Sequence, residues 1–527
     1  FVVDVSLYGY WGFRLDATPV FYFLSSPQDA VASVSGGYIA LGLLAVLAYA
    51  ALLYGLFYAV LLRRRVWHMP ATRSPLLVSL VLLVLTGALF IPIRGGFSVA
   101  SMNTGHVYFS TDQRLNHAAI NPAFSLVESL SKQKNFAAQY RFMPADEAAR
   151  RMRGLIDPAV RDKKIVAPAD TLWALSAAPR PDILLIVLES FSAHLMGSLG
   201  GEPVAVHLDS LAAEGVLFTN FYANGTRTDK GLVSILSGYP AQPTTSIMKY
   251  PHKSQSLPGL ARSLGRAGYE AHYYYGGDVN FTNMQSYLRS SGFSDIVSDV
   301  NFPLTQQLSK WGVPDHWVFR RLLDDLTAEA ETKAQTPGRA PRFRVLQTSS
   351  SHEPFDVPYH RFDNPRVNAF AYTDSCVGDF IRRFRALPQW EHTLVVLVPD
   401  HQGAYPDLDN LSVERYRIPL ILTGGVVRAP RRVDIYGSQQ DIAATLLSQL
   451  GLPHGDYTFS KDLMNPESPH FAFFTCTDMF GFVTSDNRLV YDCQSGRVAV
   501  DGGAARGANL LPGQAYLQSL YDDLAGR

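Results

Sequence analysis

The pattern of hydrophobic and polar positions separates an apolar N-terminal part from a longer part in which short apolar runs alternate with polar segments. Gly37 to Leu62 is an almost unbroken apolar run without a charged residue, and a second run extends from Leu76 to Ile93. A helix needs about 20 such residues to cross the hydrocarbon core of a bilayer. The pattern predicts a membrane region over residues 1–98, with helices at about 37–62 and 75–93; buried core helices are the alternative interpretation.

Basic residues predict the orientation of this helical pair. The loop between the runs carries four arginines, and the positive-inside rule places such a loop in the cytoplasm; these are Arg63, Arg64, Arg65 and Arg73. Everything after Arg94 is then extracytoplasmic. Because the chain starts with Phe1 and not Met, we expect further membrane helices upstream. The prediction is a multi-pass protein of the cell (inner or plasma) membrane.

Three further regions follow from the periodicity. Apolar residues recur at helical spacing in 121–131 and 146–156, so we interpret residues 99–180 as a helical connector at the membrane surface. From 181 to about 470, short apolar strands alternate with helices. That alternation predicts an α/β domain with a mostly parallel sheet flanked by helices. Residues 471–527 have short β-type runs and are expected to form a small antiparallel extension with a terminal helix.

Within the α/β region, three buried strands are expected at Asp182–Leu188, Phe343–Thr348 and Thr393–Val398. A helix is expected from Asp434 to Leu450. In open α/β sheets, ligands bind outside the carboxyl ends of the strands. The residues that follow the three strands are therefore the candidates for chemistry.

Charge and cysteine content narrow the possible partners. The formal net charge of +0 gives no reason to expect nucleic acid as a partner. The three cysteines are widely scattered without a CxxC spacing, which argues against a disulfide framework or structural zinc. One bridge between Cys476 and Cys493 stays open as an alternative.

Side chains suited to metal binding and proton transfer follow the three strands. Glu189 follows the first strand, His352 the second, and Asp400 and His401 the third. Each residue taken alone fits an ordinary loop position. Taken together, two carboxylates and an imidazole suit a divalent cation such as Mn²⁺ or Zn²⁺.

Thr228 is the candidate nucleophile. It lies before a short helix that is expected to end at Gly238, and Thr is a preferred N-cap, so capping alone would account for it. The alternative is that its hydroxyl is the fourth metal ligand. A metal lowers the pKa of a bound hydroxyl and makes it a nucleophile, and a helix N-terminus favours phosphate.

Four segments together resemble the lipoteichoic acid synthase family of membrane-anchored phosphoglycerol transferases, in the alkaline phosphatase and sulfatase superfamily. They are Val-Leu-Glu189-Ser-Phe-Ser, Asn-Gly-Thr-Arg-Thr228-Asp-Lys-Gly, Ser-Ser-His352-Glu-Pro-Phe and Pro-Asp400-His401-Gln-Gly. The resemblance implies an extracytoplasmic sulfatase-like domain with one bound ion, Mn²⁺ first and Zn²⁺ or Mg²⁺ as alternatives. It implies Glu189, Thr228, Asp400 and His401 as ligands, Thr228 as nucleophile, and His352 as substrate contact and proton donor.

The implied reaction moves a phosphoglycerol-type headgroup from a phospholipid to a glycan, lipid or polymer acceptor through a phospho-threonine intermediate. The expected donor is phosphatidylglycerol or phosphatidylethanolamine. One departure of this sequence from the family pattern bears on which of the two it is. The family carries a phosphate-binding Arg in a segment that aligns with Tyr275–Met284, where this chain has no Arg. Asp278, Asn280 and Asn283 stand there and are candidate contacts for headgroup hydroxyls or ammonium, and Arg227 is a candidate phosphate contact.

Three other functions compete with this hypothesis. A phosphoethanolamine transferase would use similar ligands and a Thr, although many such enzymes are disulfide-braced. A true sulfatase is disfavoured, because the usual Cys/Ser-x-Pro-x-Arg element is absent around Thr228. A non-catalytic membrane sensor or interaction protein on the same scaffold is the alternative from another class.

Overall fold

The computed structural model describes residues 2–11, 14–15, 36–62, 74–97, 101–132, 135–161, 180–309, 311–333, 339–403 and 405–527. The chain divides into two compact units, Phe1–Lys134 and Asn135–Arg527. The four arginines on which the predicted orientation depends lie outside the described residues, so that orientation stays a prediction.

The two apolar runs of the first unit are helical. Helix α4 (Gly36–Phe57) continues into a short π-helix, η1 (Tyr58–Leu62), and α5 (Pro75–Ala88) is followed by α6 (Phe90–Arg94). Two stretches, Ala40–Val60 and Pro75–Arg94, are long and apolar enough to cross a membrane, and neither is buried in the described structure. That exposure argues against buried core helices. The remaining elements among the described residues of this unit are α1 (Val2–Trp11), η2 (Thr104–Val107), α7 (Gln113–Ala119) and α8 (Pro122–Lys132).

The second unit is built on an eight-stranded sheet with the order β4-β3-β5-β1-β6-β7-β2-β8. Its strands are β1 (Asp182–Leu188), β2 (Val216–Tyr222), β3 (Glu270–Tyr275), β4 (Asp295–Val297), β5 (Arg342–Gln347), β6 (Thr393–Pro399), β7 (Leu420–Thr423) and β8 (Arg431–Ser438). All neighbouring pairs are parallel except those made by β7, which is antiparallel to β6 and β2. The predicted mostly parallel sheet is confirmed.

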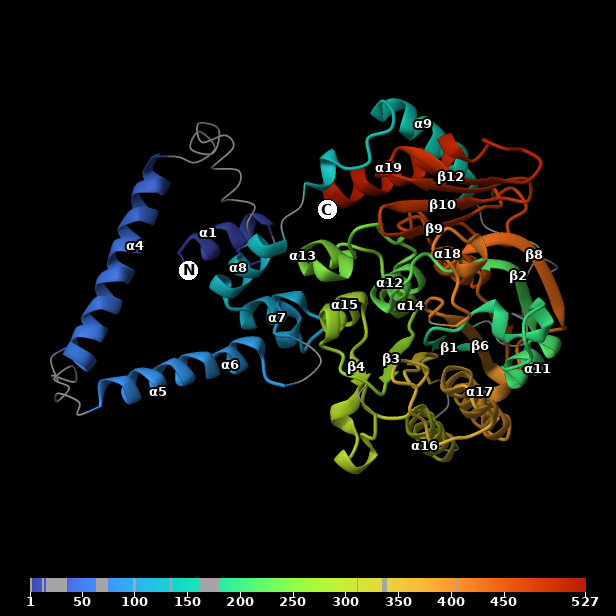
Figure 1. The fold of residues 1–527 in the computed structure, drawn as a ribbon, viewed down its shortest axis with the longest axis horizontal. Coiled ribbons are helices and arrows are strands. Elements are labelled where there is room, and N and C mark those ends of the chain that lie inside the picture. Colours follow the sequence, from blue (N-terminus) through green and yellow to red (C-terminus); the bar gives the residue numbers. More distant parts are fainter. Residues whose placement is uncertain are drawn as a thin grey trace. The chain divides into compact units, whose positions relative to one another are not determined.

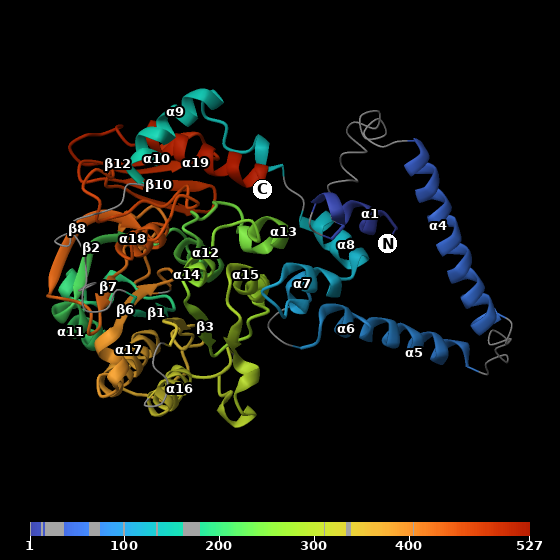
Figure 2. The same cartoon turned by 180° about the vertical axis from the view of Figure 1, so that it is seen from behind.

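Two helical layers cover this sheet, as Figures 1 and 2 show. Strand β1 is apolar on both faces: Ile183, Leu185 and Val187 belong to one core, and the alternate residues belong to the other. Both faces of the sheet must therefore be covered by helices. The first layer is α12 (Thr228–Ser237), α14 (Leu260–Arg266), α15 (Met284–Ser291) and α18 (Asp441–Gln449), and the second is α11 (Val206–Glu214), α16 (Asp315–Lys333) and α17 (Pro365–Phe384).

A second, antiparallel sheet of four strands has the order β12-β11-β10-β9. It comprises β9 (Ala472–Cys476), β10 (Met479–Val483), β11 (Arg488–Asp492) and β12 (Arg497–Gly502), and the chain then forms α19 (Leu510–Gly526). Phe473 and Phe480 of this sheet and Tyr516 of α19 belong to the same core as one face of the large sheet. The predicted small extension therefore shares its core with the α/β domain.

Residues 135–161 pack on the terminal helix. The backbone N–H groups of Phe142 and Met143 donate to Gln518 Oε1 at 2.9 and 3.1 Å, which fixes this stretch beside α19. Figure 1 shows α9 (Ala145–Leu155) next to α19. Where the structure describes this unit, its other short elements are α10 (Pro158–Arg161), α13 (Pro251–Ser254), η3 (Phe136–Ala138), η5 (Ala193–Leu195), η6 (Gly197–Leu199), η7 (Ile247–Lys249), η8 (Phe281–Asn283), η9 (Asp299–Asn301), η10 (Leu304–Gln306), η11 (Pro388–His392) and η12 (Val413–Tyr416).

Two details correct or complete the sequence interpretation. The helix expected from Asp434 begins only at Asp441, because Arg431–Ser438 forms β8 and pairs with β2. The three cysteines are free thiols, so no bridge joins Cys476 to Cys493.

Candidate active site and metal centre

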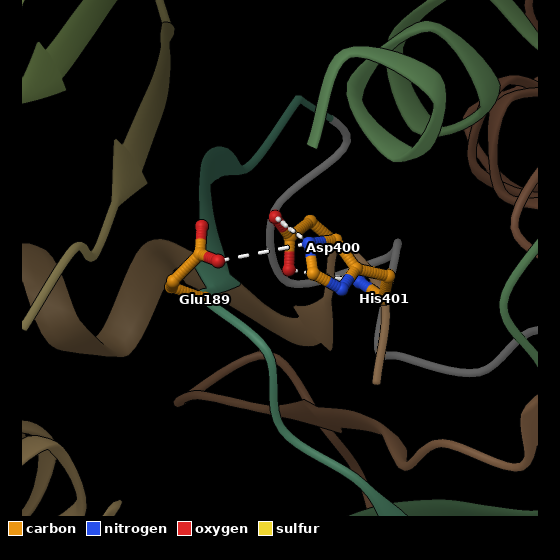
Figure 3. Close-up of side chains that lie close together, drawn as sticks. All are labelled: Glu189, Asp400 and His401. Atoms are coloured by element: carbon orange, nitrogen blue, oxygen red, sulfur yellow. Dashed lines mark hydrogen bonds and ion pairs between the residues drawn. The ribbon is translucent and has the colours of Figure 1, made fainter. Parts of the chain in front are cut away.

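Three candidate ligands converge at the carboxyl ends of neighbouring strands. Glu189 follows β1, and Asp400 and His401 follow β6, which lies beside β1 in the sheet. All three side chains are buried, and one ligand atom from each lies within 4.8 Å of the others. Figure 3 shows the Glu189 carboxylate pointing toward Asp400 and His401. The cluster is the arrangement that the strand ends predict.

The two carboxylate oxygens of Asp400 have different surroundings. Oδ1 accepts hydrogen bonds from the backbone N–H groups of Ser190 (2.9 Å) and His401 (2.8 Å). Oδ2 is buried and has no hydrogen-bond partner among the described residues. Burial, followed by the charge of Glu189, raises the pKa of Asp400 to about 7. An unpaired buried carboxylate oxygen is costly, and a bound cation would compensate it.

The imidazole of His401 is oriented by the backbone carbonyl of the next residue. Nδ1 lies 2.9 Å from the Gln402 carbonyl oxygen, to which it donates when it carries the proton, and Nε2 is then left with its lone pair. Nε2 lies 3.6 Å from Glu189 Oε1 and 3.5 Å from Asp400 Oδ2. Burial lowers the pKa of His401, but the charges of Asp400 and Glu189 oppose it, and the net pKa is raised.

Thr228 joins this cluster through its hydroxyl. Oγ1 donates to Glu189 Oε2 at 3.3 Å and lies 3.5 Å from His401 Nε2. The capping interpretation is wrong: Arg227 is the N-cap residue of α12, no side chain caps this helix, and Thr228 is its first residue. Its hydroxyl is thus directed to the cluster, at the helix end where backbone N–H groups favour an anion.

A glycine allows α12 to approach the Asp400 loop closely. A Cβ added at Gly231 would lie 2.1 Å from the Asp400 carbonyl oxygen. No side chain other than hydrogen fits this contact. The helix then ends at Gly238, whose φ of 57° lies in the left-handed region.

Buried polar groups around the cluster fix its backbone. Gln439 Nε2 donates to the carbonyl oxygens of Pro399 and Asp400, both at 2.7 Å. Thr348 Oγ1 accepts from the Glu189 N–H at 2.9 Å, and Ser351 Oγ donates to the Glu189 carbonyl at 2.6 Å. Sequence reasoning missed Gln439 and Thr348, because only the folded chain brings them to the strand ends.

His352 packs against an aromatic residue that sequence reasoning also missed. Its ring lies on Trp311, with centroids 4.0 Å apart, and Phe281 meets the same indole edge-on at 5.8 Å. Trp311 Nε1–H donates to the Glu353 carbonyl at 2.6 Å. Burial lowers the pKa of His352, and the neighbouring charge of His401 acts in the same direction.

The predicted headgroup contacts lie in the turn after β3. Asp278 Oδ1 accepts from the Asn280 N–H at 2.9 Å, and the Asn283 amide donates to the Lys249 carbonyl at 3.4 Å. Phe281, which contacts Trp311, belongs to the same turn. Arg227 is exposed at the start of α12. The roles of these residues in substrate binding stay predictions.

The last residue of the segment that the resemblance aligns with the family's Arg-containing segment is part of the core. Met284 is 1% exposed at the start of α15. Arg289, the nearest arginine in sequence, donates to the Phe293 carbonyl at 3.3 Å, near the end of its own helix. Because this guanidinium binds the backbone at the helix end, it does not replace the family's phosphate-binding Arg.

The residues fit a divalent cation. Oδ2 of Asp400 is orphaned, His401 Nε2 faces both carboxylates, and Thr228 Oγ1 completes four donor atoms of types that Zn²⁺ or Mn²⁺ accepts. Ligand atoms bound at about 2.0–2.2 Å from one ion lie roughly 3–3.5 Å apart. The separations from Thr228 Oγ1 to Glu189 and to His401, 3.3 and 3.5 Å, match that spacing.

Comparisons with known proteins agree with this fold. The family model described as Sulfatase matches residues 181–452, and the chain belongs to this family. Lipoteichoic acid synthase-like YvgJ from Bacillus subtilis (strain 168) is 20% identical over 357 residues, which cover 61% of this chain and 56% of the relative. The match therefore spans little more than half of that relative's length.

Two solved structures share the architecture. One is a protein in the alkaline phosphatase superfamily from Vibrio parahaemolyticus, with a TM-score of 0.63 and 24% identity over 74% of this chain and 98% of that one. The other is the lipoteichoic acid synthase LtaP from Listeria monocytogenes, with a TM-score of 0.58 and 18% identity over 72% of this chain and 97% of that one. At these identities the likeness shows the fold alone.

Proposed function

We propose that this protein is a membrane-anchored transferase that moves a phosphoglycerol-type headgroup from a phospholipid to an extracytoplasmic acceptor through a phospho-threonine intermediate. The observation that carries the proposal is the hydroxyl of Thr228, held between Glu189 and His401 at the start of α12. The lipoteichoic acid synthase-like relative supports the reaction class, and the two exposed apolar helices support the membrane attachment.

The four donor residues would hold one divalent cation, for which we propose Mn²⁺. When bound, such a cation lowers the pKa of a coordinated hydroxyl and neutralises negative charge on a phosphoryl group. Thr228 Oγ attacks the phosphorus, and its proton moves to a neighbouring base; Glu189 Oε2, 3.3 Å from Oγ1, is our candidate for this base. The N–H groups at the start of α12 stabilise the added negative charge on the phosphate.

The first step breaks the bond between phosphorus and the glycerol oxygen of diacylglycerol. His352 donates a proton to that oxygen, which requires an imidazole with a pKa near the working pH. In the second step an acceptor hydroxyl attacks the same phosphorus, and the Thr228 Oγ–P bond breaks. His352 then takes the proton of the acceptor, and the proton held by Glu189 returns to Thr228 Oγ as the Oγ–P bond breaks, so the enzyme returns to its starting state.

A second candidate, phosphoethanolamine transfer, is favoured by the charge of the turn after β3. The segment Tyr275–Met284 lacks the family's Arg. Asp278 lies close enough to Asp299 to help raise the pKa of Asp299, although burial is the larger cause. Carboxylates suit an ammonium headgroup better than a phosphate. A hydrolytic sulfatase has less support, because the Cys/Ser-x-Pro-x-Arg element is absent around Thr228.

The test is diacylglycerol release from phosphatidylglycerol and from phosphatidylethanolamine, measured in detergent with Mn²⁺ or with chelator. We expect metal-dependent release from one lipid, which identifies the donor. Thr228→Ala should abolish it. Thr226→Ala, which removes a half-buried threonine two residues earlier in the same loop, is the matched control and should retain it. Release of diacylglycerol by the Thr228→Ala protein at the rate of the parent protein would contradict the proposal.

A further inference from the structure

Three strongly exposed apolar side chains gather in one short segment of the second unit. Val300 is 79% exposed, Leu304 83% and Leu308 64%. Among the described residues of 135–527, the other large apolar side chains that are exposed are Val498 at 40% and Leu511 at 43%. We call residues 299–309 the apolar loop. Its concentration of exposed apolar surface is the kind that marks an interaction site.

The apolar loop is held in place by its own contacts. Phe302 is buried in the core beneath it, and Gln307 Nε2 donates to the carbonyl oxygens of Asp299 (3.1 Å) and Phe302 (3.4 Å). Ser298 and Asn301 form a reciprocal capping box at its start. These bonds fix the backbone while Val300, Leu304 and Leu308 point to solvent.

The loop leads directly to the candidate active site. Ser309 pairs with Gly312 across a β-bridge, and Trp311 between them lies on His352. The Val313 N–H donates to the Gly276 carbonyl at 2.8 Å, which joins this bridge to the end of β3. Figures 1 and 2 show the yellow-green segment after β4 projecting from the body of this unit.

We propose that the apolar loop inserts Val300, Leu304 and Leu308 into the interfacial region of the lipid bilayer that carries the donor. The inference deepens the proposed function and rests on its phospholipid donor. Insertion removes three apolar side chains from water, which favours binding. Asp299 is the one charged residue in the sequence of the loop, so little charge opposes contact with headgroups. A bilayer is favoured over a protein partner because this chain also contains two unburied candidate spans.

The contact can be measured without turnover. A Leu304→Cys variant of the full chain, in a Cys493→Ser background, is labelled with an environment-sensitive fluorophore and reconstituted in phosphatidylglycerol–phosphatidylcholine vesicles; Cys376 and Cys476 are buried. Val498→Cys, labelled in the same way, is the matched control. We expect a blue shift and strong quenching by doxyl-labelled lipids at 304 but not at 498. Quenching at 304 no greater than at 498 would overturn the inference, as would a blue shift without lipid quenching, which indicates a protein contact.

Activity supplies a second readout. The triple variant Val300→Ser, Leu304→Ser, Leu308→Ser should lose at least tenfold in turnover of a vesicle-embedded donor. It should keep its turnover of a water-soluble short-chain donor, which shows that the site is intact. Val498→Ser with Leu511→Ser should change neither. Equal loss on both donors would contradict a lipid-docking role, whereas failure of every protein to turn over any lipid would contradict the proposed function and leave the quenching result valid.

Discussion

The rings of Trp311 and His352 lie against each other, with their centroids 4.0 Å apart, although they are 41 positions apart in the chain. The indole N–H donates at 2.6 Å to the carbonyl of Glu353, the residue after His352. One side chain therefore contacts the ring of the proposed proton donor and holds the backbone of the residue that follows it. This relationship makes Trp311 a positioning residue for His352.

We predict that Trp311→Ala lowers kcat about tenfold, because an aromatic contact and one hydrogen bond contribute about 1–2 kcal/mol together. Trp311→Phe should restore most of the activity, since it keeps the ring contact. The pH–rate profile of the Ala variant should also shift to higher pH. Loss of the indole exposes His352 and weakens the burial that lowers the pKa of its imidazole. An unchanged profile in both variants would show that Trp311 has no influence on His352. Trp317→Phe, on α16, is the control.

Metal affinity should fall as the pH is lowered. In the metal-free protein, burial and the charge of Glu189 raise the pKa of Asp400 from 3.8 to about 7. Because this folded-state pKa is raised, the carboxyl stabilises the metal-free protein at low pH, and that contribution is lost as the pH rises through about 7. A cation competes with the same proton. We expect Mn²⁺ affinity to weaken roughly tenfold per pH unit below about 7 for each proton released.

Titration calorimetry in buffers of different ionisation enthalpy measures both the affinity and the released protons. Asp400→Asn should lose binding at every pH. Asp456→Asn, which removes an exposed carboxylate, should bind like the parent protein. Binding of Mn²⁺ that is independent of pH from about 5 to 8 would exclude Asp400 as a ligand.

Gly231→Ala should damage the site more than an ordinary helix substitution. Its Cβ would lie 2.1 Å from the Asp400 carbonyl oxygen, so α12 must move away from the loop that carries two ligands. We expect a loss of about 1–3 kcal/mol in the free energy of unfolding and a large loss of Mn²⁺ affinity. Thermal unfolding with and without Mn²⁺ measures both effects.

The matched control is Gly265→Ala in α14, where an added Cβ meets nothing within 4 Å. Ala favours a helix over Gly by up to about 1 kcal/mol, so this variant should be as stable as the parent or more stable. If the two variants behave alike, the close approach of α12 to Asp400 is not what holds the site.

The sequence predicts the ligand cluster because strand ends can be recognised from apolar runs. Val-Leu-Glu189 and Val-Pro-Asp400-His401 each close a fully buried strand, and the carboxyl ends of neighbouring parallel strands meet at one edge. Trp311 carries no such signal, because only tertiary folding brings it to His352. The approach of Thr228 to Glu189 also depends on a tertiary contact, at Gly231.

From the sequence, only β1, β5 and β6 of the large sheet are predicted by residue range, and β8 and β12 show why other strands are missed. β8 is an edge strand with mostly exposed or half-buried residues over Arg431–Tyr436, and its pairing with β2 decides its structure, not an apolar run. β12 is likewise an exposed edge strand that pairs only with β11 in its sheet. Local periodicity is weak where one face of a strand stays in solvent.

The central claim, that Thr228 is the nucleophile, is tested most directly by trapping the intermediate. Excess full-length protein with Mn²⁺ is mixed with phosphatidylglycerol or phosphatidylethanolamine labelled in the headgroup, without acceptor, then quenched in acid and mapped by peptide mass spectrometry. The account predicts a covalent phospho-headgroup on the peptide at Thr228, formed with one equivalent of diacylglycerol and absent from Thr228→Ala. Diacylglycerol release by the Thr228→Ala protein at a rate close to that of the parent would contradict it.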